Sequence, residues 1–396
     1  MPRHASQTRV PALSRRLTFM ALAIALPLAI GRPVAADDTF QNGFPADKGF
    51  FPIGVWQQWP GRAPLYRAMG INTIVGLYEG PTEAQLAELA KHGMFAIGEQ
   101  NDVALGSANS AVIKGWMQAD EPDNAQPVAP GQWGPCIPAA EVARRTLAMK
   151  ERDPTRPILL NFGRGVADET WPGRGPCTGD LDYYDAAIAG ADILSFDIYP
   201  VSSDTPHVQG NLEYVARGVA NLTRCAAAGQ AVWGVIETTA IQMQRHVTPA
   251  ELRAEVWMAL IHGATGIVYF VHEWTGGFRE DGIFRYPDIV AAVAKTNASI
   301  TALAAVLNGP TIPSLVAVAS EVPIATMAKR QGDALYVFAV AMRGDPSTPW
   351  FALRGLRDGR AIVIDEDRAV DVKGGILEDS FAGYGVHLYK IVPAPG

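Results

Sequence analysis

The feature that most constrains this chain is the regular alternation of short apolar, β-rich runs with amphipathic stretches between residues 50 and about 305. Strands that alternate with helices in this way form parallel sheets. Eight strands with their helices in about 250 residues match the dimensions of a (β/α)8 barrel, also called a TIM barrel. The eight strand candidates are FFPIGVW (50–56), INTIVGLY (71–78), MFAIGE (94–99), VIKGWMQ (112–118), RPILLNF (156–162), ADILSFDIY (191–199), AVWGVIE (231–237) and TGIVYFV (265–271).

Four of the intervening stretches have a clear helical period: 81–93, 139–153, 211–228 and 249–263. In the first of them Leu86, Leu89 and Ala90 share a face, and Gly93 supplies a stop signal. An open doubly wound sheet is the alternative fold for such a pattern. That fold is disfavoured because the first strand–helix turn lacks a Gly-rich phosphate fingerprint.

Beyond residue 310 the apolar period changes to two, and turn signals separate the runs. These runs are SLVAVAS, IATMAKRQGDALYVFAVAM, WFALRGL, RAIVIDE and GVHLYKI. We therefore predict a barrel over residues 37–308 and a small antiparallel β-sandwich over 309–396. Because no long linker separates the two, we expect them to pack firmly.

The first 36 residues have the composition of a signal peptide. Four arginines precede the apolar run LTFMALAIALPLAI (17–30), and Val34-Ala35-Ala36 offers a cleavage site, so the mature chain is expected to begin near Asp37. A membrane anchor is the competing interpretation, but the run is short for a span and Pro27 interrupts it. The string SRRLTF also loosely resembles a twin-arginine signal. We expect an exported protein, periplasmic or extracellular, with no membrane span in the mature chain.

The charge and the cysteine content restrict the classes of ligand and the disulfide that we expect. Loss of residues 1–36 removes five of the 33 Lys/Arg and no acid, which leaves 28 basic against 40 acidic side chains. Nucleic acid is therefore an unsuitable partner. Export exposes thiols to an oxidising compartment, so we predict a Cys136–Cys177 disulfide between two loops and a small buried Cys225. No metal or cofactor is predicted, because ligand spacings such as CxxC or HxxxH do not occur.

In a (β/α)8 barrel the chemistry lies at the carboxyl ends of the strands. Two acids there suit glycosidic hydrolysis, which needs one carboxyl to protonate the leaving oxygen and a second to attack the anomeric carbon or activate water. Glu121 follows the fourth strand and Glu237 ends the seventh. Asp197 is interpreted as a structural acceptor within the sixth strand. Further polar and aromatic candidates for sugar contacts at strand ends are Gln58, Trp59, Asp120, Asn161, Tyr199, Glu273 and Trp274.

The segment GWMQADEP (115–122) resembles the Asn-Glu-Pro motif of the clan A glycoside hydrolases, and AGYGVHLYKI resembles the β-domain that often follows their barrel. The resemblance implies a retaining mechanism, with Glu121 as acid/base and Glu237 as nucleophile. It also implies that Tyr199 hydrogen-bonds the nucleophile and that Trp274 forms a platform beneath the sugar. Asp120 departs from the motif, which usually has Asn there to bind the sugar 2-hydroxyl.

Three other functions stay open at this stage. Glu273 could replace Glu237 as nucleophile, and a non-catalytic sugar-binding barrel could keep the same aromatic residues. Metal-dependent hydrolysis would need several converging His and Asp ligands, of which only His272 stands at a strand end. The prediction is a secreted glycosidase acting on an oligo- or polysaccharide, whose sugar, linkage and oligomeric state the sequence does not reveal.

Overall fold

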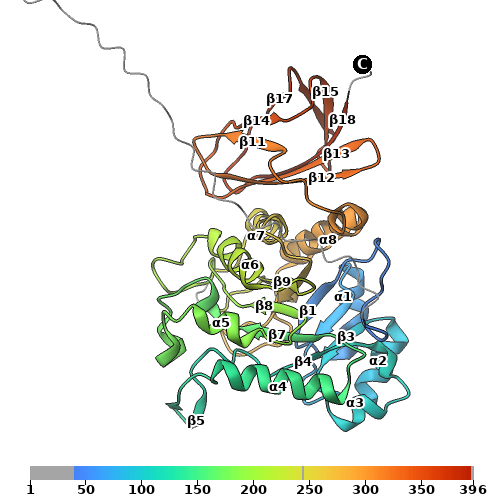
Figure 1. The fold of residues 1–396 in the computed structure, drawn as a ribbon, viewed down its shortest axis with the longest axis vertical. Helices are drawn as coiled ribbons and strands as arrows, with labels where there is room; N and C mark the ends of the chain where they lie inside the picture. The colour runs from blue at the N-terminus through green and yellow to red at the C-terminus, as the bar shows by residue number, and fades with distance from the viewer. Residues whose placement is uncertain (1–39, 243–244, 394–396) are drawn as a thin grey trace, which may run out of the picture. The chain divides into compact units, whose positions relative to one another are not determined.

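The structure is a computed structural model that describes residues 40–242 and 245–393. The predicted signal peptide lies outside the described residues. Eight parallel strands close into a barrel in the order β1-β2-β3-β4-β7-β8-β9-β10, with β10 paired back to β1 (Figure 1). The strands are β1 (Ile53–Trp56), β2 (Thr73–Val75), β3 (Phe95–Gly98), β4 (Ile113–Met117), β7 (Ile158–Phe162), β8 (Ile193–Phe196), β9 (Ala231–Glu237) and β10 (Gly266–Phe270). The predicted barrel is confirmed, and each strand falls inside its predicted run.

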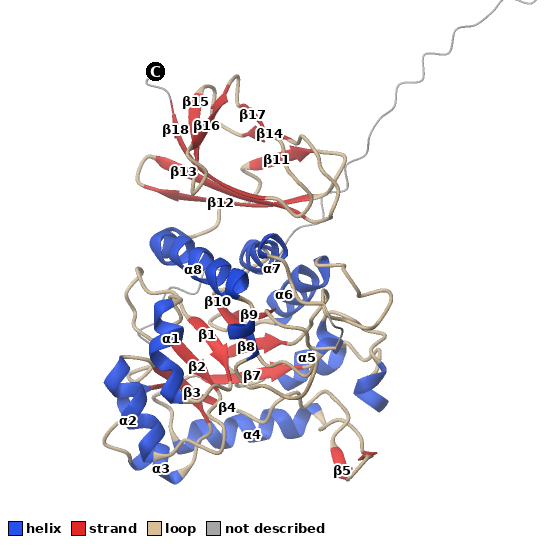
Figure 2. Cartoon of the chain, turned by 180° about the vertical axis from the view of Figure 1, so that it is seen from behind, coloured by secondary structure: helices blue, strands red, loops and turns tan. Residues whose placement is uncertain are grey.

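Eight helices cover the barrel, as Figure 2 shows. They are α1 (Ala63–Ala68), α2 (Glu83–His92), α3 (Asp102–Gly106), α4 (Ala139–Arg152), α5 (Asp182–Ala187), α6 (Glu213–Cys225), α7 (Pro249–Ile261) and α8 (Pro287–Leu307). Local sequence sets their ends. Thr82 and Thr248 form capping boxes at the starts of α2 and α7, and Gly93 ends α2 with a left-handed φ of 60°.

Alternate residues of each strand point into the barrel or out towards the helices. The interior layer contains Trp56, Val75, Ile97, Met117, Leu159, Ile193, Trp233, Val235, Val268 and Phe270. The neighbouring Leu160, Phe162, Leu194 and Phe196 belong instead to the core under the helices. Asn161 lies two residues after the interior Leu159, and Asp197 lies four residues after the interior Ile193. The alternation therefore directs both side chains towards the mouth of the barrel.

Helix α8 is the only described helix whose length and apolar composition would suit a membrane span. Half of that stretch is buried inside the protein, and Ile289, Val293, Ile300 and Leu303 pack into the main core. A core helix has the same composition, so α8 is accounted for by packing within the protein.

The C-terminal part forms two antiparallel sheets around a core of its own. One sheet has the order β11-β14-β17 and the other β12-β13-β18-β15-β16. Their bounds are β11 (Val316–Ala319), β12 (Ile324–Gln331), β13 (Ala334–Ala341), β14 (Trp350–Leu353), β15 (Gly359–Val363), β16 (Arg368–Val372), β17 (Ile376–Glu378) and β18 (Val386–Pro393). The predicted β-domain is confirmed, although β16 and β17 were not predicted, because they are only five and three residues long. The same holds for a hairpin of β5 (Pro127–Ala129) and β6 (Gln132–Trp133) in the loop after β4.

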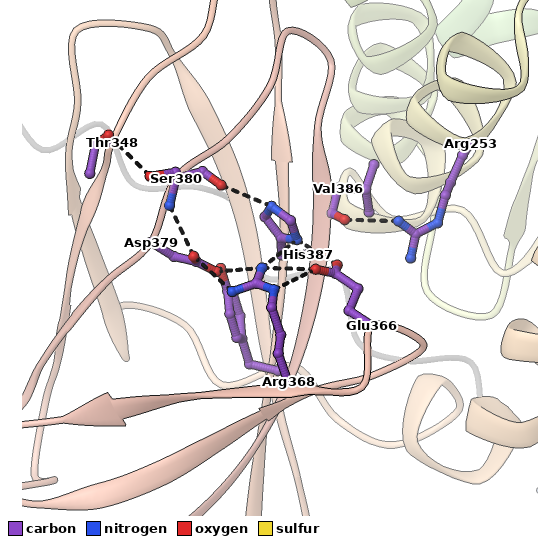
Figure 3. A network of polar contacts seen from close by, with 9 residues as sticks. Arg253, Thr348, Glu366, Arg368, Asp379, Ser380, Val386 and His387 are labelled. Carbon is purple, nitrogen blue, oxygen red and sulfur yellow. Dashed lines mark hydrogen bonds and ion pairs between the residues drawn. The ribbon is translucent and has the colours of Figure 1, made fainter.

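Direct contacts join α7 to the C-terminal sheet. Trp257 stacks on Phe338 with ring centroids 5.2 Å apart, and Arg253 donates a hydrogen bond of 2.8 Å to the Val386 carbonyl (Figure 3). Beside Val386, Arg368 forms a two-pronged ion pair with Asp379 at 2.9 and 2.8 Å. Each residue labelled in this network takes part in at least one hydrogen bond or ion pair, which is the property of a structural cluster.

Candidate active site

The carboxyl ends of β4, β7 and β8 bring four predicted or neighbouring polar residues into one cluster. The side-chain amide of Asn161 donates to both Asp120 Oδ1 (2.9 Å) and Asp197 Oδ1 (3.1 Å). Tyr199 donates its hydroxyl hydrogen bond to Asp197 Oδ2 at 2.8 Å. Asn161 therefore holds two carboxyl groups within reach of a single nitrogen.

Glu121 stands at the edge of this cluster in a constrained turn. Its φ is 43°, a left-handed value that side chains rarely adopt outside functional sites and tight turns. Its backbone N–H donates to the Asn161 carbonyl at 3.0 Å, and Asn124 donates to its Oε2 at 2.8 Å. The residue as a whole is half-buried, and these two hydrogen bonds hold the turn and its carboxyl group in place.

Electrostatics in this cluster favour protonated carboxyl groups. Burial raises the pKa of Glu121 well above its ordinary value, and the charges of Asp197, Asp120 and Asp123 raise it further. Burial raises the pKa of Asp197 to about 7, with the charge of Asp120 adding to the effect. Asp120 is exposed as a whole residue, but its carboxyl group is surrounded by protein. Burial of that group raises its pKa to about 6. A raised pKa is what a proton donor at neutral pH requires.

A buried scaffold supports the Glu121 turn from behind. Asp123 accepts hydrogen bonds from the Gly163 N–H (2.7 Å) and the Tyr184 hydroxyl (2.9 Å). The fully buried Arg174 lies 3.7 Å from Asp123 and above the Tyr184 ring. Sequence reasoning missed Asp123, Asn124 and Arg174, because their roles depend on loops that meet only in the folded chain.

The predicted Cys136–Cys177 disulfide is present and joins the loop after β4 to the loop after β7, with Cα atoms 6.3 Å apart. Both of these loops carry parts of the scaffold. Cys225 was predicted to be buried but is half-buried at the end of α6, because the last turn of that helix faces partly outward.

Glu237 lies in a different environment. Its side chain has no exposed surface, and its two oxygens accept hydrogen bonds from the backbone N–H groups of Val201 (2.6 Å) and Ser202 (2.9 Å). Glu255 of α7 lies against it, although neither Glu255 oxygen has a hydrogen-bond partner of good geometry within the described part of the chain. Burial raises the pKa of Glu237 to about 7. The structure therefore places this carboxyl between β9, the loop after β8 and α7.

These positions imply a pH-dependent stability. Glu237 is more easily protonated in the folded state than in the unfolded chain. Its contribution to the free energy of unfolding is therefore complete below its ordinary pKa of about 4.5 and is lost as pH rises through about 7. We expect the free energy of unfolding to fall by about 2 to 3 kcal/mol from this group between pH 5 and pH 8. Burial and the charge of Glu237 also raise the pKa of Glu255, so Glu255→Gln should remove the share of this second acid and make the total decline smaller in urea titrations at the two pH values. An unchanged decline in the variant would contradict this interpretation of the pair.

Two further predicted contact residues are occupied within the protein. Gln58 is fully buried, donates to the Glu280 carbonyl at 2.6 Å and accepts from the Tyr66 hydroxyl. Glu273 is 1% exposed, and Arg285 donates to it at 3.0 Å. Gln58 is thus placed to hold a loop and has no accessible surface, and its contact with substrate stays a prediction. The ion pair likewise argues against Glu273 as a nucleophile.

Aromatic side chains form a row that starts at the carboxyl cluster. The ring centroids of Tyr199 and Phe270 lie 4.8 Å apart. Phe270 stacks on Trp274 with centroids 5.7 Å apart and an interplanar angle of 12°, and the centroid of Trp274 lies 5.5 Å from that of Phe278. Trp274 is 46% exposed and Phe278 is 61% exposed. Trp59, at 52%, is exposed on the loop after β1. Sequence reasoning had found Trp274 and Trp59 but missed Phe278, because nothing in the sequence distinguishes it from other loop residues.

Within residues 40–242 and 245–393, no group of three or more His, Cys, Asp or Glu side chains is arranged to hold a metal ion. His272 interacts with the Gln57 carbonyl at 3.2 Å and packs on Phe270.

No family model matches the chain, and no curated protein matches it in sequence. Solved structures do match its fold. The α-amylase of Geobacillus thermoleovorans, solved with acarbose, aligns over 91% of this chain and all of its own, with a TM-score of 0.52 and 11% identity. An Anoxybacillus α-amylase aligns over 88% of this chain and 99% of its own, with a TM-score of 0.54 and 11% identity. A structure described as a glycoside hydrolase aligns over 87% and 93%, with a TM-score of 0.52 and 13% identity. At such identities the matches establish the shared architecture: a (β/α)8 barrel followed by a β-domain.

Proposed function

We propose that the protein is a glycoside hydrolase in which Glu121 is the general acid/base. The observation that carries the proposal is the carboxyl group of the half-buried Glu121, which Asn124 holds at the mouth of the barrel among further carboxyl groups and whose pKa is raised well above its ordinary value. The three structural neighbours are described as α-amylases or a glycoside hydrolase, which is consistent with this chemistry.

The proposed reaction is a double displacement on an oligo- or polysaccharide. Protonated Glu121 donates its proton to the leaving glycosidic oxygen while an ionised carboxylate attacks the anomeric carbon. Glu121 then removes a proton from the water that releases the sugar. The sequence assigns the attacking carboxylate to Glu237, and that assignment requires the Glu237 side chain to leave the Val201 and Ser202 amides.

Activity measurements test the proposal directly. The wild-type protein, incubated with a panel of aryl glycosides and with plant and bacterial polysaccharides, should release sugar from at least one of them, and NMR of the product should show retained anomeric configuration. A folded protein that binds sugars and releases none would favour the non-catalytic alternative.

The exposed aromatic row supports sugar stacking, because the apolar face of a pyranose packs well on an indole ring. We expect Trp274→Ala to raise KM by about 10-fold, about 1.4 kcal/mol, with a smaller change in kcat. Trp350→Ala is the matched control, since Trp350 is 55% exposed on β14 of the C-terminal domain. Equal KM values for the two variants would exclude the row as a substrate platform.

We further propose that the protein is exported and that residues 1–36 are removed. The Cys136–Cys177 disulfide supports this, because disulfides persist in oxidising compartments. Sequencing of the N-terminus of the mature protein tests it, with a start near residue 37 expected.

A further inference from the structure

We infer that Asp197, rather than Glu237, is the carboxylate that works opposite Glu121. The inference rests on the proposed glycosidase function and concerns which second side chain completes the site. Four observations carry it: the direction of the side chain, its neighbours, its small exposed surface, and the confinement of Glu237.

The direction of Asp197 follows from the alternation along β8. Ile193 belongs to the interior layer of the barrel, and Ser195 donates a hydrogen bond of 2.6 Å to Asn161. Leu194 and Phe196 face the helices, and Phe196 lies where a side chain at Gly218 of α6 would clash. Asp197 comes next on the inward side, directly after the last residue of the strand.

The neighbours of Asp197 are those of a catalytic carboxylate. Its two oxygens each accept one side-chain hydrogen bond, from Asn161 and from Tyr199. Such donors stabilise the ionised form and fix the orientation of the group. Asn161 links Asp197 to Glu121, because its side-chain amide donates to Asp197 Oδ1 at 3.1 Å and its carbonyl accepts from the Glu121 N–H at 3.0 Å. The same Tyr199 ring begins the aromatic row, so the pair lies next to the surface on which a sugar would stack.

Access separates the two candidates. Asp197 is 8% exposed and adjoins the exposed Asp120 and the half-buried Glu121, whereas Glu237 is 0% exposed. Both Glu237 oxygens are already bound by main-chain amides, and Glu255 lies against the same carboxyl. To attack a sugar, Glu237 would have to break these hydrogen bonds and move away from Glu255. Asp197 needs no such movement.

The reaction balances with Asp197 in this role. An ionised Asp197 oxygen forms a bond to the anomeric carbon as the bond from that carbon to the leaving oxygen breaks, and the leaving oxygen takes the Glu121 proton. Water then gives its proton to Glu121 and its oxygen to the anomeric carbon, which releases Asp197 as a carboxylate. No other reactant is needed.

Paired variants test the inference. On an aryl glycoside that the wild type hydrolyses, Asp197→Asn should lower kcat on the order of 10³-fold or more, and Glu237→Gln should lower it far less. Sodium azide should restore turnover to Asp197→Asn and yield a glycosyl azide of inverted configuration, because the small anion occupies the space of the lost carboxylate. Recovery by azide also shows that the variant is folded. Near-normal activity of Asp197→Asn beside an inactive Glu237→Gln would overturn the inference.

Covalent labelling gives a second and independent readout. A 2-deoxy-2-fluoro glycosyl fluoride of the sugar that the wild type hydrolyses should leave a stable ester on the nucleophile of the wild-type enzyme. Trypsin separates the candidates, because Asp197 falls in the peptide 175–217 and Glu237 in 225–245. A label on 175–217 supports the inference. A label on 225–245, or none on an enzyme that turns over the parent glycoside, overturns it, while a wild type without any glycosidase activity overturns the proposed function itself.

Discussion

Glu121→Gln is expected to lower kcat/KM on natural glycosides by about 10³-fold, because the leaving oxygen then departs without a proton. That loss corresponds to about 4 kcal/mol of transition-state stabilisation. The substitution keeps the size of the side chain and an oxygen that can still accept from Asn124. The measurement is steady-state kinetics on a disaccharide and on an aryl glycoside with a strongly acidic phenol.

The choice of leaving group separates catalysis from misfolding. A dinitrophenolate needs no proton to depart, so Glu121→Gln should retain far more of the bond-breaking step on that substrate than on the disaccharide. Glu79→Gln is the matched control, since Glu79 is an exposed acid at the same face of the barrel after β2. Equal losses on both substrates would show that Glu121 supports the structure and does not donate the proton.

Arg174→Met is expected to destabilise the protein by about 3 to 5 kcal/mol, the typical loss when one partner of a buried ion pair is removed. Arg174 and Asp123 have no exposed side-chain surface, and Asp123 would be left as an uncompensated acid behind the Glu121 turn. The guanidinium also donates to the Asp180 carbonyl at 3.1 Å. Denaturant unfolding at pH 7 under non-reducing conditions measures the change.

Arg343→Met supplies the comparison. Arg343 is 61% exposed and lies 3.8 Å from Glu213, so its loss should cost less than about 1 kcal/mol. If both variants lose the same stability, the Asp123–Arg174 pair has no special role in holding the loop. If Arg174→Met is destabilised as expected, its remaining activity at low temperature reports how far the position of Glu121 depends on this scaffold.

The barrel could be predicted from sequence because each strand and helix signals itself locally. Periods of 2 and 3.6 and the stop at Gly93 depend on residues a few positions apart, and a β/α alternation repeated eight times leaves few folds open. The strands β16 and β17 were not predicted because Arg368–Val372 and Ile376–Glu378 are too short to show a clear period of two.

The same distinction between local signals and long-range contacts applies to the residues of the candidate site. Glu121, Asn161 and Asp197 could be placed at carboxyl ends of barrel strands from local patterns alone, because strand limits and the period of two are local properties. The orientation of Glu237 depends instead on contacts between segments that are distant in sequence. The pairing of β8 with β9 is limited to Ile193–Ala231 and Leu194–Val232, and past it the loop at Val201 and Ser202 presents two N–H groups to the Glu237 carboxyl. A buried carboxylate takes the donors that the fold brings to it, and donors that come from another strand's loop cannot be read from the residues beside it.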